Sequence, residues 1–299
     1  MTDVAIDVSG LTKYYGSFRG IEDVTFQVEP GSIHGFLGPN GAGKTTTIRI
    51  LVGLMGPSSG TAHIFGHEAG SLAAKKLIGY LPSDFGLPRH YTVSQYLDLI
   101  ETLQGGAPYR EELVTRMQLD SSRKTAELSR GNRQKVSIVQ ALMHEPRILI
   151  ADEPTAGLDP LMQAEFNAYL KEYIDRGGTV FVSSHILADV QGICEKIEVI
   201  RDGSIVSSGE ITELLSGMPR KIVVTPRDGM DIEQLATDIG AKVGTREFDK
   251  ISLFVEGDLR QSTKQLLDRP EVLDFAIPSP SLEEYFMQIY TGKGMKEGV

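Results

Sequence analysis

The sequence predicts an α/β fold, in which a mixed sheet core carries an antiparallel β lobe and a helical subdomain and is followed by a small α+β domain. Three observations predict it. A short apolar run leads through a glycine-rich turn into a segment of helix-like composition. Two later apolar runs are separated by a helical pattern, which is typical of parallel strands. After Gly217 and Pro219 the pattern changes to short strands and helices in the βαββαβ order of a ferredoxin-like domain.

Residues 1–216 are predicted to form the larger domain. Its opening alternates apolar and polar residues, as half-buried strands of an antiparallel lobe do. Apolar residues at helical spacing between residues 91 and 143 predict a helical subdomain over about residues 85–145. The Asp202-Gly203 pair between two apolar runs predicts a hairpin. The expected strands are residues 4–8, 24–28, 33–37, 148–151, 179–183, 197–201 and 204–207, and the expected helices outside the subdomain are residues 45–55 and 161–174.

Residues 217–299 are predicted to form the small accessory domain. A closing helix over residues 281–290 is expected, with Ser281 as its N-cap and Glu284 three positions beyond it, which is a capping-box pattern. The other expected elements are strands at residues 221–225, 241–248, 251–256 and 272–277 and helices at residues 230–239 and 258–267.

The composition narrows the possible functions. A formal net charge of -10 argues against nucleic acid as a partner, because a surface that follows phosphates normally carries a basic excess. Cys194 is the only cysteine, so no internal disulfide can form and a reducing cytosol is the simplest compartment. The N-terminal segment lacks the basic start and apolar core of a signal peptide. No run approaches the roughly 20 apolar residues of a bilayer span, so another chain would have to cross any membrane that this protein serves.

The glycine-rich turn matches the phosphate-loop pattern of two glycines followed by Lys and Thr, and it lies between a predicted strand and a predicted helix. Backbone N–H groups of such a turn close around a β-phosphate, and the helix N-terminus adds positive potential. Lys44 would span the β- and γ-phosphates, and the Thr45 hydroxyl would hold Mg²⁺. The predicted nucleotide-binding residues here are Gly38, Pro39, Asn40, Gly41, Ala42, Gly43, Lys44, Thr45 and Thr46.

Two adjacent acids end a later apolar strand. Asp152 is expected in the outer coordination of the Mg²⁺ site, and Glu153, pointing the other way, is expected to act on attacking water. Without the phosphate loop, an ordinary strand end with solvated acids would be an equal alternative. With the loop present, the chemical interpretation is favoured.

The segment Leu128-Ser129-Arg130-Gly131-Asn132, called here the signature turn, precedes a helix that extends to about His144. Ser129 is a typical N-cap. A capped helix start with free N–H groups also binds phosphate, so the structural and functional interpretations share one cause. The remaining question is which molecule supplies the phosphate.

These motifs recur in the same order in the ATP-binding-cassette family, which the sequence resembles over roughly residues 1–215. The resemblance also includes the Ala156-Gly157-Leu158-Asp159 turn and His185 after Ser183-Ser184. It implies a P-loop NTPase cassette that binds ATP and Mg²⁺, hydrolyses ATP and docks head to tail with a second cassette. In such a pair each ATP lies between the phosphate loop of one subunit and the signature turn of the other.

By this resemblance, Ser129 and Gly131 contact the nucleotide of the partner, and Asp159 communicates across the dimer. Tyr15 stacks on adenine, with the neighbouring Tyr14 as the competing choice. His185 contacts the γ-phosphate, and Glu153 is the general base or orients the water. The catalytic residues implied are therefore Lys44, Glu153 and His185.

The sequence departs from the family pattern at two places. The signature turn has Arg130 and Asn132 where the family usually has Gly and Gln. Ser83 stands where the family normally has a Gln that reaches Mg²⁺, and a Ser is too short to copy that reach. Water could fill the gap, Asp84 could substitute, or coupling to the membrane subunit could use other contacts. The candidate metal ligands are Thr45, Asp152 and Ser83.

The Arg-bearing signature turn, the following Arg133-Gln134-Lys135 and the segment from Pro280 to Phe286 resemble an exporter-type subgroup whose cassette pairs with a separate membrane permease. This predicts a peripheral subunit on the cytoplasmic face of the cell membrane, paired with a second cassette, most simply a copy of itself. The small domain would add regulatory or dimer contacts or serve as a passive appendage. The alternative is a non-transport cassette ATPase acting on ribosomes, but such proteins carry two cassettes per chain. A metabolic P-loop kinase has no need of the signature turn.

Overall fold

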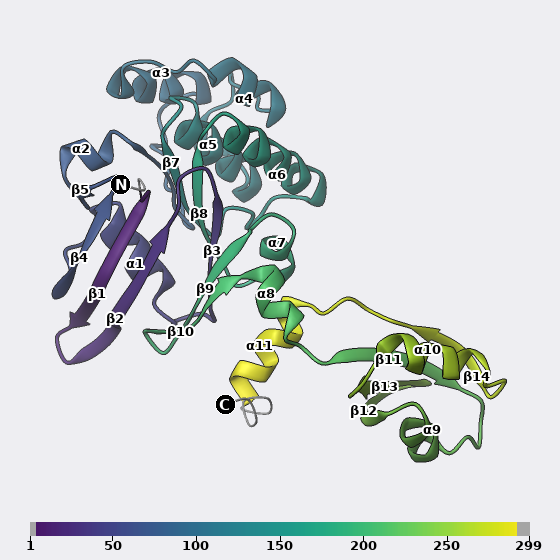
Figure 1. Cartoon of the computed structure of the whole chain (residues 1–299). Helices are drawn as coiled ribbons and strands as arrows, with labels where there is room; N and C mark the ends of the chain where they lie inside the picture. Colours follow the sequence, from purple (N-terminus) through teal and green to yellow (C-terminus); the bar gives the residue numbers. More distant parts are fainter. Residues whose placement is uncertain (1–3, 292–299) are drawn as a thin grey trace. The chain divides into compact units, whose positions relative to one another are not determined.

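The computed structural model describes residues 4–291, which form two compact units (Figure 1). The first unit ends at Glu210 and the second begins at Ile211. Among the described residues, no helix combines the length and the apolar character that a membrane crossing demands. The two units are described separately below.

The first unit opens with an antiparallel four-stranded sheet in the order β2-β1-β4-β5. Its strands are β1 (Ile6–Tyr15), β2 (Phe18–Val28), β4 (Ser59–Ile64) and β5 (His67–Glu68). The β1–β2 hairpin extends beyond the predicted strands, because pairing continues to Tyr15 opposite Phe18. The lobe therefore carries a tyrosine to the tip of its hairpin.

A six-stranded sheet in the order β10-β9-β3-β8-β7-β6 forms the core of the first unit. Its strands are β3 (Ile33–Leu37), β6 (Ile78–Leu81), β7 (Ile148–Asp152), β8 (Thr179–Ser184), β9 (Lys196–Arg201) and β10 (Ser204–Glu210). All neighbouring pairs are parallel except β9 and β10. Every residue of β3, β7 and β8 is buried, as expected for parallel strands covered on both faces. The carboxyl ends of these three strands thus meet at one edge of the sheet.

Aromatic packing joins the lobe to the core sheet. Phe26 of β2 stacks on Phe36 of β3 and on Phe181 of β8, with ring centroids 5.6 and 5.5 Å apart. Such pairs stabilise by about 0.5–1.5 kcal/mol beyond the burial of their surface. The lobe is therefore held firmly beside the strand that leads into the phosphate loop.

Helices of the first unit surround this core (Figure 1). They are α1 (Lys44–Leu51), α2 (Leu72–Lys75), α3 (Val93–Gln104), α4 (Arg110–Arg116), α5 (Arg130–Leu142), α6 (Pro160–Asp175) and α7 (Leu187–Gln191), with a 3-10 turn at Thr125–Glu127. In the predicted helical subdomain, Thr92 and Gln95 form a capping box at the start of α3. Arg116 of α4 forms ion pairs of 2.7 and 2.6 Å with Glu165 and Glu172 of α6, which ties the subdomain to the core.

The second unit contains an antiparallel sheet in the order β12-β13-β11-β14 with its own apolar core. Its elements are α8 (Ile211–Ser216), β11 (Arg220–Pro226), α9 (Ile232–Asp238), β12 (Ala241–Glu247), β13 (Lys250–Val255), α10 (Leu259–Leu267), β14 (Val272–Ala276) and α11 (Leu282–Thr291). Between α8 and α11 the order is βαββαβ, so the predicted fold class is confirmed. The unit starts earlier than the boundary predicted after residue 216, because α8 packs against α11.

The expected cap of the last helix is present. The Glu284 N–H donates to Ser281 Oγ at 3.2 Å, and the Ser281 N–H donates to Glu284 Oε2 at 3.4 Å. Lys221 of β11 also pairs with Glu284. The capping glutamate thus fastens the start of α11 to the sheet of the same unit.

Candidate functional site

The glycine-rich turn connects β3 to α1, and two of its glycines are required by geometry. A Cβ at Gly38 would lie 2.3 Å from the Ile200 carbonyl oxygen, so no side chain fits there. Gly43 has a φ of 112°, and a Cβ there would lie 2.5 Å from Ile21 Cγ2. No side chain caps the N-terminus of α1, so its first N–H groups are available to an anion.

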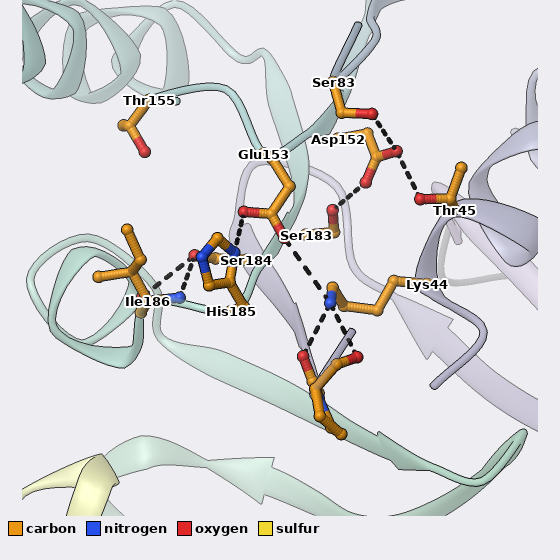
Figure 2. A network of polar contacts seen from close by, with 12 residues as sticks. Lys44, Thr45, Ser83, Asp152, Glu153, Thr155, Ser183, Ser184, His185 and Ile186 are labelled. Carbon is orange, nitrogen blue, oxygen red and sulfur yellow. Dashed lines mark hydrogen bonds and ion pairs between the residues drawn. The ribbon is translucent and has the colours of Figure 1, made fainter. Parts of the chain in front are cut away.

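Lys44 is the first residue of α1, and its side chain folds back over the turn. Its Nζ donates to the carbonyl oxygens of Gly38 at 2.7 Å and Pro39 at 3.2 Å, and lies 3.7 Å from Glu153 Oε1 (Figure 2). Burial lowers the pKa of Lys44, while the carboxylates of Glu153 and Asp152 oppose that shift. The ammonium is thus positioned at the centre of the turn, where phosphate charge would replace the carbonyl dipoles.

Asp152 lies at the end of β7 and accepts three hydroxyl hydrogen bonds. Its Oδ2 accepts from Thr45 Oγ1 at 2.8 Å and Ser83 Oγ at 3.1 Å, and its Oδ1 accepts from Ser183 Oγ at 2.5 Å (Figure 2). The three candidate metal ligands therefore lie together, with the hydroxyls of Thr45 and Ser83 on one carboxylate oxygen of Asp152. Carboxylate and hydroxyl oxygens are the donors that Mg²⁺ prefers, so the residues present fit that ion.

Ser183 is a site residue that the sequence analysis did not single out. The register of the sheet places it directly opposite Asp152 on the neighbouring strand β8. Both side chains are buried, at 0% and 1% exposure. The available signal was the shared position of the two residues at adjacent strand ends, but the pairing register is not visible in one sequence.

Glu153 turns its side chain away from Asp152, as expected from its position. It has a φ of 55°, and its N–H donates to the Ser183 carbonyl oxygen at 3.2 Å. A non-glycine residue in this left-handed region is uncommon, and such residues occur in turns and cluster at functional sites. The carboxylate lies between Lys44 and His185, whose Nδ1 is 2.5 Å from Glu153 Oε2 (Figure 2). The strained backbone thus presents the carboxylate to the pocket rather than to the metal site.

A pocket of about 500 Å³ extends over these groups. This volume is within the range of small-ligand sites, which is about 300–1,000 Å³. Its lining residues are Tyr15, Phe18, Gly20, Asn40, Gly41, Gly43, Lys44, Thr45, Thr46, Ser83, Arg130, Glu153, Ala156 and His185. The pocket therefore joins the hairpin tip of the lobe, the phosphate loop and the acidic strand end.

Tyr15 contributes to this pocket and Tyr14 does not. The Tyr15 hydroxyl lies 3.2 Å from Thr46 Oγ1, whereas the Tyr14 hydroxyl donates to Glu22 at 2.6 Å. Phe18, which is 72% exposed, lines the same end of the pocket and was not among the sequence candidates. In the sequence, Phe18 could have been recognised as a pocket residue from its position directly after the hairpin turn that follows Tyr15.

Seven predicted residues do not line this pocket. Four of them, Gly38, Pro39, Ala42 and Asp152, belong to the phosphate loop and the acidic strand end beside it, and the other three lie on two further turns. Ser129 is exposed and caps α5, accepting from the Asn132 N–H at 3.3 Å, and Asp159 caps α6, accepting from the Met162 N–H at 3.0 Å. A Cβ at Gly131 would lie 2.7 Å from the Gly157 carbonyl oxygen, so the signature turn packs closely on the 156–159 turn. Neither Ser129, Gly131 nor Asp159 lines the pocket of its own chain.

Comparison with known proteins identifies relatives of this chain. The family model described as ABC transporter matches residues 21–156. The daunorubicin resistance ATP-binding protein DrrA3 of Streptomyces coeruleorubidus is 30% identical, over 97% of this chain and 96% of that protein. The probable multidrug ABC transporter ATP-binding protein YbhF of Escherichia coli (strain K12) is 35% identical over 71% of this chain, which spans only 38% of YbhF.

The first unit also resembles solved structures. The dimeric post-hydrolysis state of the ATP-binding cassette MJ0796, bound to ADP and Pi, matches with a TM-score of 0.63 and 25% identity, over 69% of this chain and 98% of that chain. The predicted family and cassette fold are thereby confirmed. The phosphate loop, the acidic strand end and these likenesses together show that the chain belongs to the ABC transporter family.

Proposed function

We propose that the chain binds Mg-ATP in the pocket beside its phosphate loop, and that two copies close head to tail on two nucleotides to drive a separate membrane permease. The observation that carries this proposal is that the two adjacent acids at the end of β7 face different groups. Asp152 faces the hydroxyls of Thr45 and Ser83, and Glu153 faces the pocket with Lys44 and His185.

The phosphate loop and Lys44 bind the triphosphate in this proposal. Free N–H groups at the start of α1 and the Lys44 ammonium supply positive potential where the β- and γ-phosphates lie. The hydroxyls of Thr45 and Ser83, with Asp152 behind them, would hold Mg²⁺, which neutralises phosphate charge when bound. The hydrogen bond from Ser83 to Asp152 supports a place for Ser83 at the metal site despite its short side chain.

Glu153 is the proposed group that accepts hydrogen bonds from the attacking water. His185 Nδ1 already contacts its Oε2, which orients the carboxylate and leaves the Nε2 of His185 for the γ-phosphate. Tyr15 lies beside Thr46 at the other end of the pocket, where its ring offers an aromatic surface to adenine.

The second copy supplies the signature turn. Ser129 is exposed at the start of the 13-residue helix α5, and Gly131 keeps the turn free of a side chain beside it. Asp159 is exposed on the adjacent turn, where it would communicate between the copies. The solved cassette MJ0796 is dimeric, which supports the arrangement.

The permease partner places the chain at the cytoplasmic face of the cell membrane. Relatives named for multidrug transport and for daunorubicin resistance support export as the direction. This part of the proposal is tested by co-purifying the chain with its permease and reconstituting both in vesicles. The proposal predicts that each partner stimulates the activity of the other. A chain that pellets with ribosomes instead would favour the non-transport alternative.

The substitution Glu153→Gln tests the active-site assignment. The amide keeps the size of the side chain but cannot act as a base, so the variant is expected to bind ATP and accumulate as an ATP-bound dimer. Size-exclusion chromatography with bound-nucleotide analysis measures this, with Glu233→Gln at an exposed position of α9 as a control away from the pocket. Wild-type turnover of Glu153→Gln would reject the assignment.

A further inference from the structure

Arg130 stands apart from the rest of the signature turn, because its side chain lines the nucleotide pocket of its own chain. It shares that pocket with Lys44, Glu153 and His185. Among residues 128–132, no other residue lines the pocket. The position is also one of the two in this turn where the sequence departs from the family pattern.

The path of the side chain follows from its contacts with the neighbouring turn. Arg130 is the first residue of α5, and a Cβ at Gly157 would lie 3.4 Å from its Cγ and 3.5 Å from its Nε. The aliphatic part of Arg130 therefore extends along the backbone of the 156–159 turn, which has no side chain at Gly157 to block it. Arg130 and Ala156 of this turn both line the pocket.

The guanidinium of Arg130 forms no ion pair or hydrogen bond with any residue of the described range 4–291. Arg110 and Arg116, on the same helical subdomain, are each paired with two or more carboxylates. The one carboxylate that lines the pocket, Glu153, is already engaged by Lys44 and His185. A guanidinium without a partner in a phosphate pocket is suited to bind phosphate oxygens in a bidentate manner.

The charge of the pocket also calls for a further cation. The positive charge of Lys44 is partly offset by Glu153 at 3.7 Å and by the nearby carboxylate of Asp152. Even with Mg²⁺ bound, a triphosphate brings more negative charge than Lys44 and the N-terminus of α1 balance. A second cation at the Glu153 end of the pocket would meet the terminal phosphate rather than the α-phosphate or the base.

We propose that Arg130 binds the terminal phosphate of the ATP held by its own chain, so that the signature turn detects whether that pocket contains ATP or ADP. The inference rests on the proposed function, in which Ser129 and Gly131 of the same turn meet the nucleotide of the partner. One turn would then contact both nucleotides of the closed pair, with its backbone toward one and its Arg130 side chain toward the other. Loss of the terminal phosphate in one pocket would release the turn that completes the other.

The test measures ATP and ADP affinities of the full chain by calorimetry in a Ser129→Asp background. That substitution retains an N-cap for α5 but places a negative charge where the partner's phosphate would lie, so only the chain's own pocket is measured. Arg130→Ala is expected to weaken ATP binding about tenfold, equivalent to about 1.4 kcal/mol, and to leave ADP binding unchanged. Arg130→Lys should retain part of the preference for ATP.

Arg133→Ala is the matched control, because Arg133 is exposed on the first turn of α5 and does not line the pocket. An unchanged ratio of ATP to ADP affinity in Arg130→Ala would overturn the inference. Equal weakening of both nucleotides would also overturn it, because that result indicates a general effect on the pocket. Lys44→Ala tests the proposed function separately from the inference about Arg130. If Lys44→Ala binds ATP as tightly as the parent does, the proposed function itself fails.

Discussion

Two substitutions of Asp152 separate what its carboxylate does for the fold from what it does for hydrolysis. Asp152→Ala removes the acceptor of three hydroxyl groups, of which Ser183 is fully buried. Hydrogen bonds to a charged group contribute about 1.5–3 kcal/mol each, and the burial of the carboxylate offsets part of the sum, so we expect a net loss of about 3 kcal/mol. For a unit of this size, that loss lowers the unfolding temperature by about 6–12 °C.

Asp152→Asn keeps one acceptor oxygen and gives the serine and threonine hydroxyls an amide to which they can adapt. We expect it to cost about 1 kcal/mol of stability. It removes the negative charge behind Thr45 and Ser83, however, and should therefore lower kcat about a hundredfold. The asparagine variant is thus expected to be nearly as stable as the parent but almost inactive.

The assays are chemical denaturation in the presence of EDTA and ATP hydrolysis in the presence of Mg²⁺. Asp175→Asn, at the exposed end of α6, controls for the loss of one charge. If Asp152→Asn loses as much stability as Asp152→Ala, the hydrogen-bond reasoning is wrong. If Asp152→Asn hydrolyses ATP at the parental rate, the metal assignment is wrong.

Two further predictions concern other parts of the first unit. Burial raises the pKa of the Cys194 thiol, so the thiol remains protonated at neutral pH. A thiol reagent should therefore react with Cys194 only as fast as the first unit opens. Rapid reaction of the folded chain would contradict this prediction. Gly131→Ala brings a Cβ to within 2.7 Å of the Gly157 carbonyl oxygen. It should lower ATP turnover and lower the free energy of unfolding by about 1–3 kcal/mol, because one of the two turns must shift to admit the methyl group. Unchanged turnover and unchanged stability would refute the close approach.

The sequence was sufficient to predict the elements whose signals are local. The apolar run before Gly38, the helix beginning near Lys44 and the adjacent acids at residues 152 and 153 each carry their own signature, and the structure brings Lys44 and both acids together. The capping box at Ser281 was predictable for the same reason, since both partners lie within four positions of each other.

Features that depend on long-range pairing could not be predicted from one sequence. Strands β4 and β6 were not identified, because β4 is largely exposed and β6 has only four residues, and both are defined by their partners. The contact between Ser183 and Asp152 depends on sheet register, and the reach of Arg130 depends on how α5 packs on the 156–159 turn. Neither arrangement has a signal in the sequence spacing.

Mixing two inactive variants tests the shared site most directly. Lys44→Ala disables the phosphate loop, and Ser129→Asp disables the signature turn while keeping a cap on α5. In a mixed pair both defects fall in one composite site, and the other site combines an intact phosphate loop with an intact signature turn. We predict that the mixture regains ATP hydrolysis that neither variant has alone, whereas a mixture as inactive as its components would contradict the composite site.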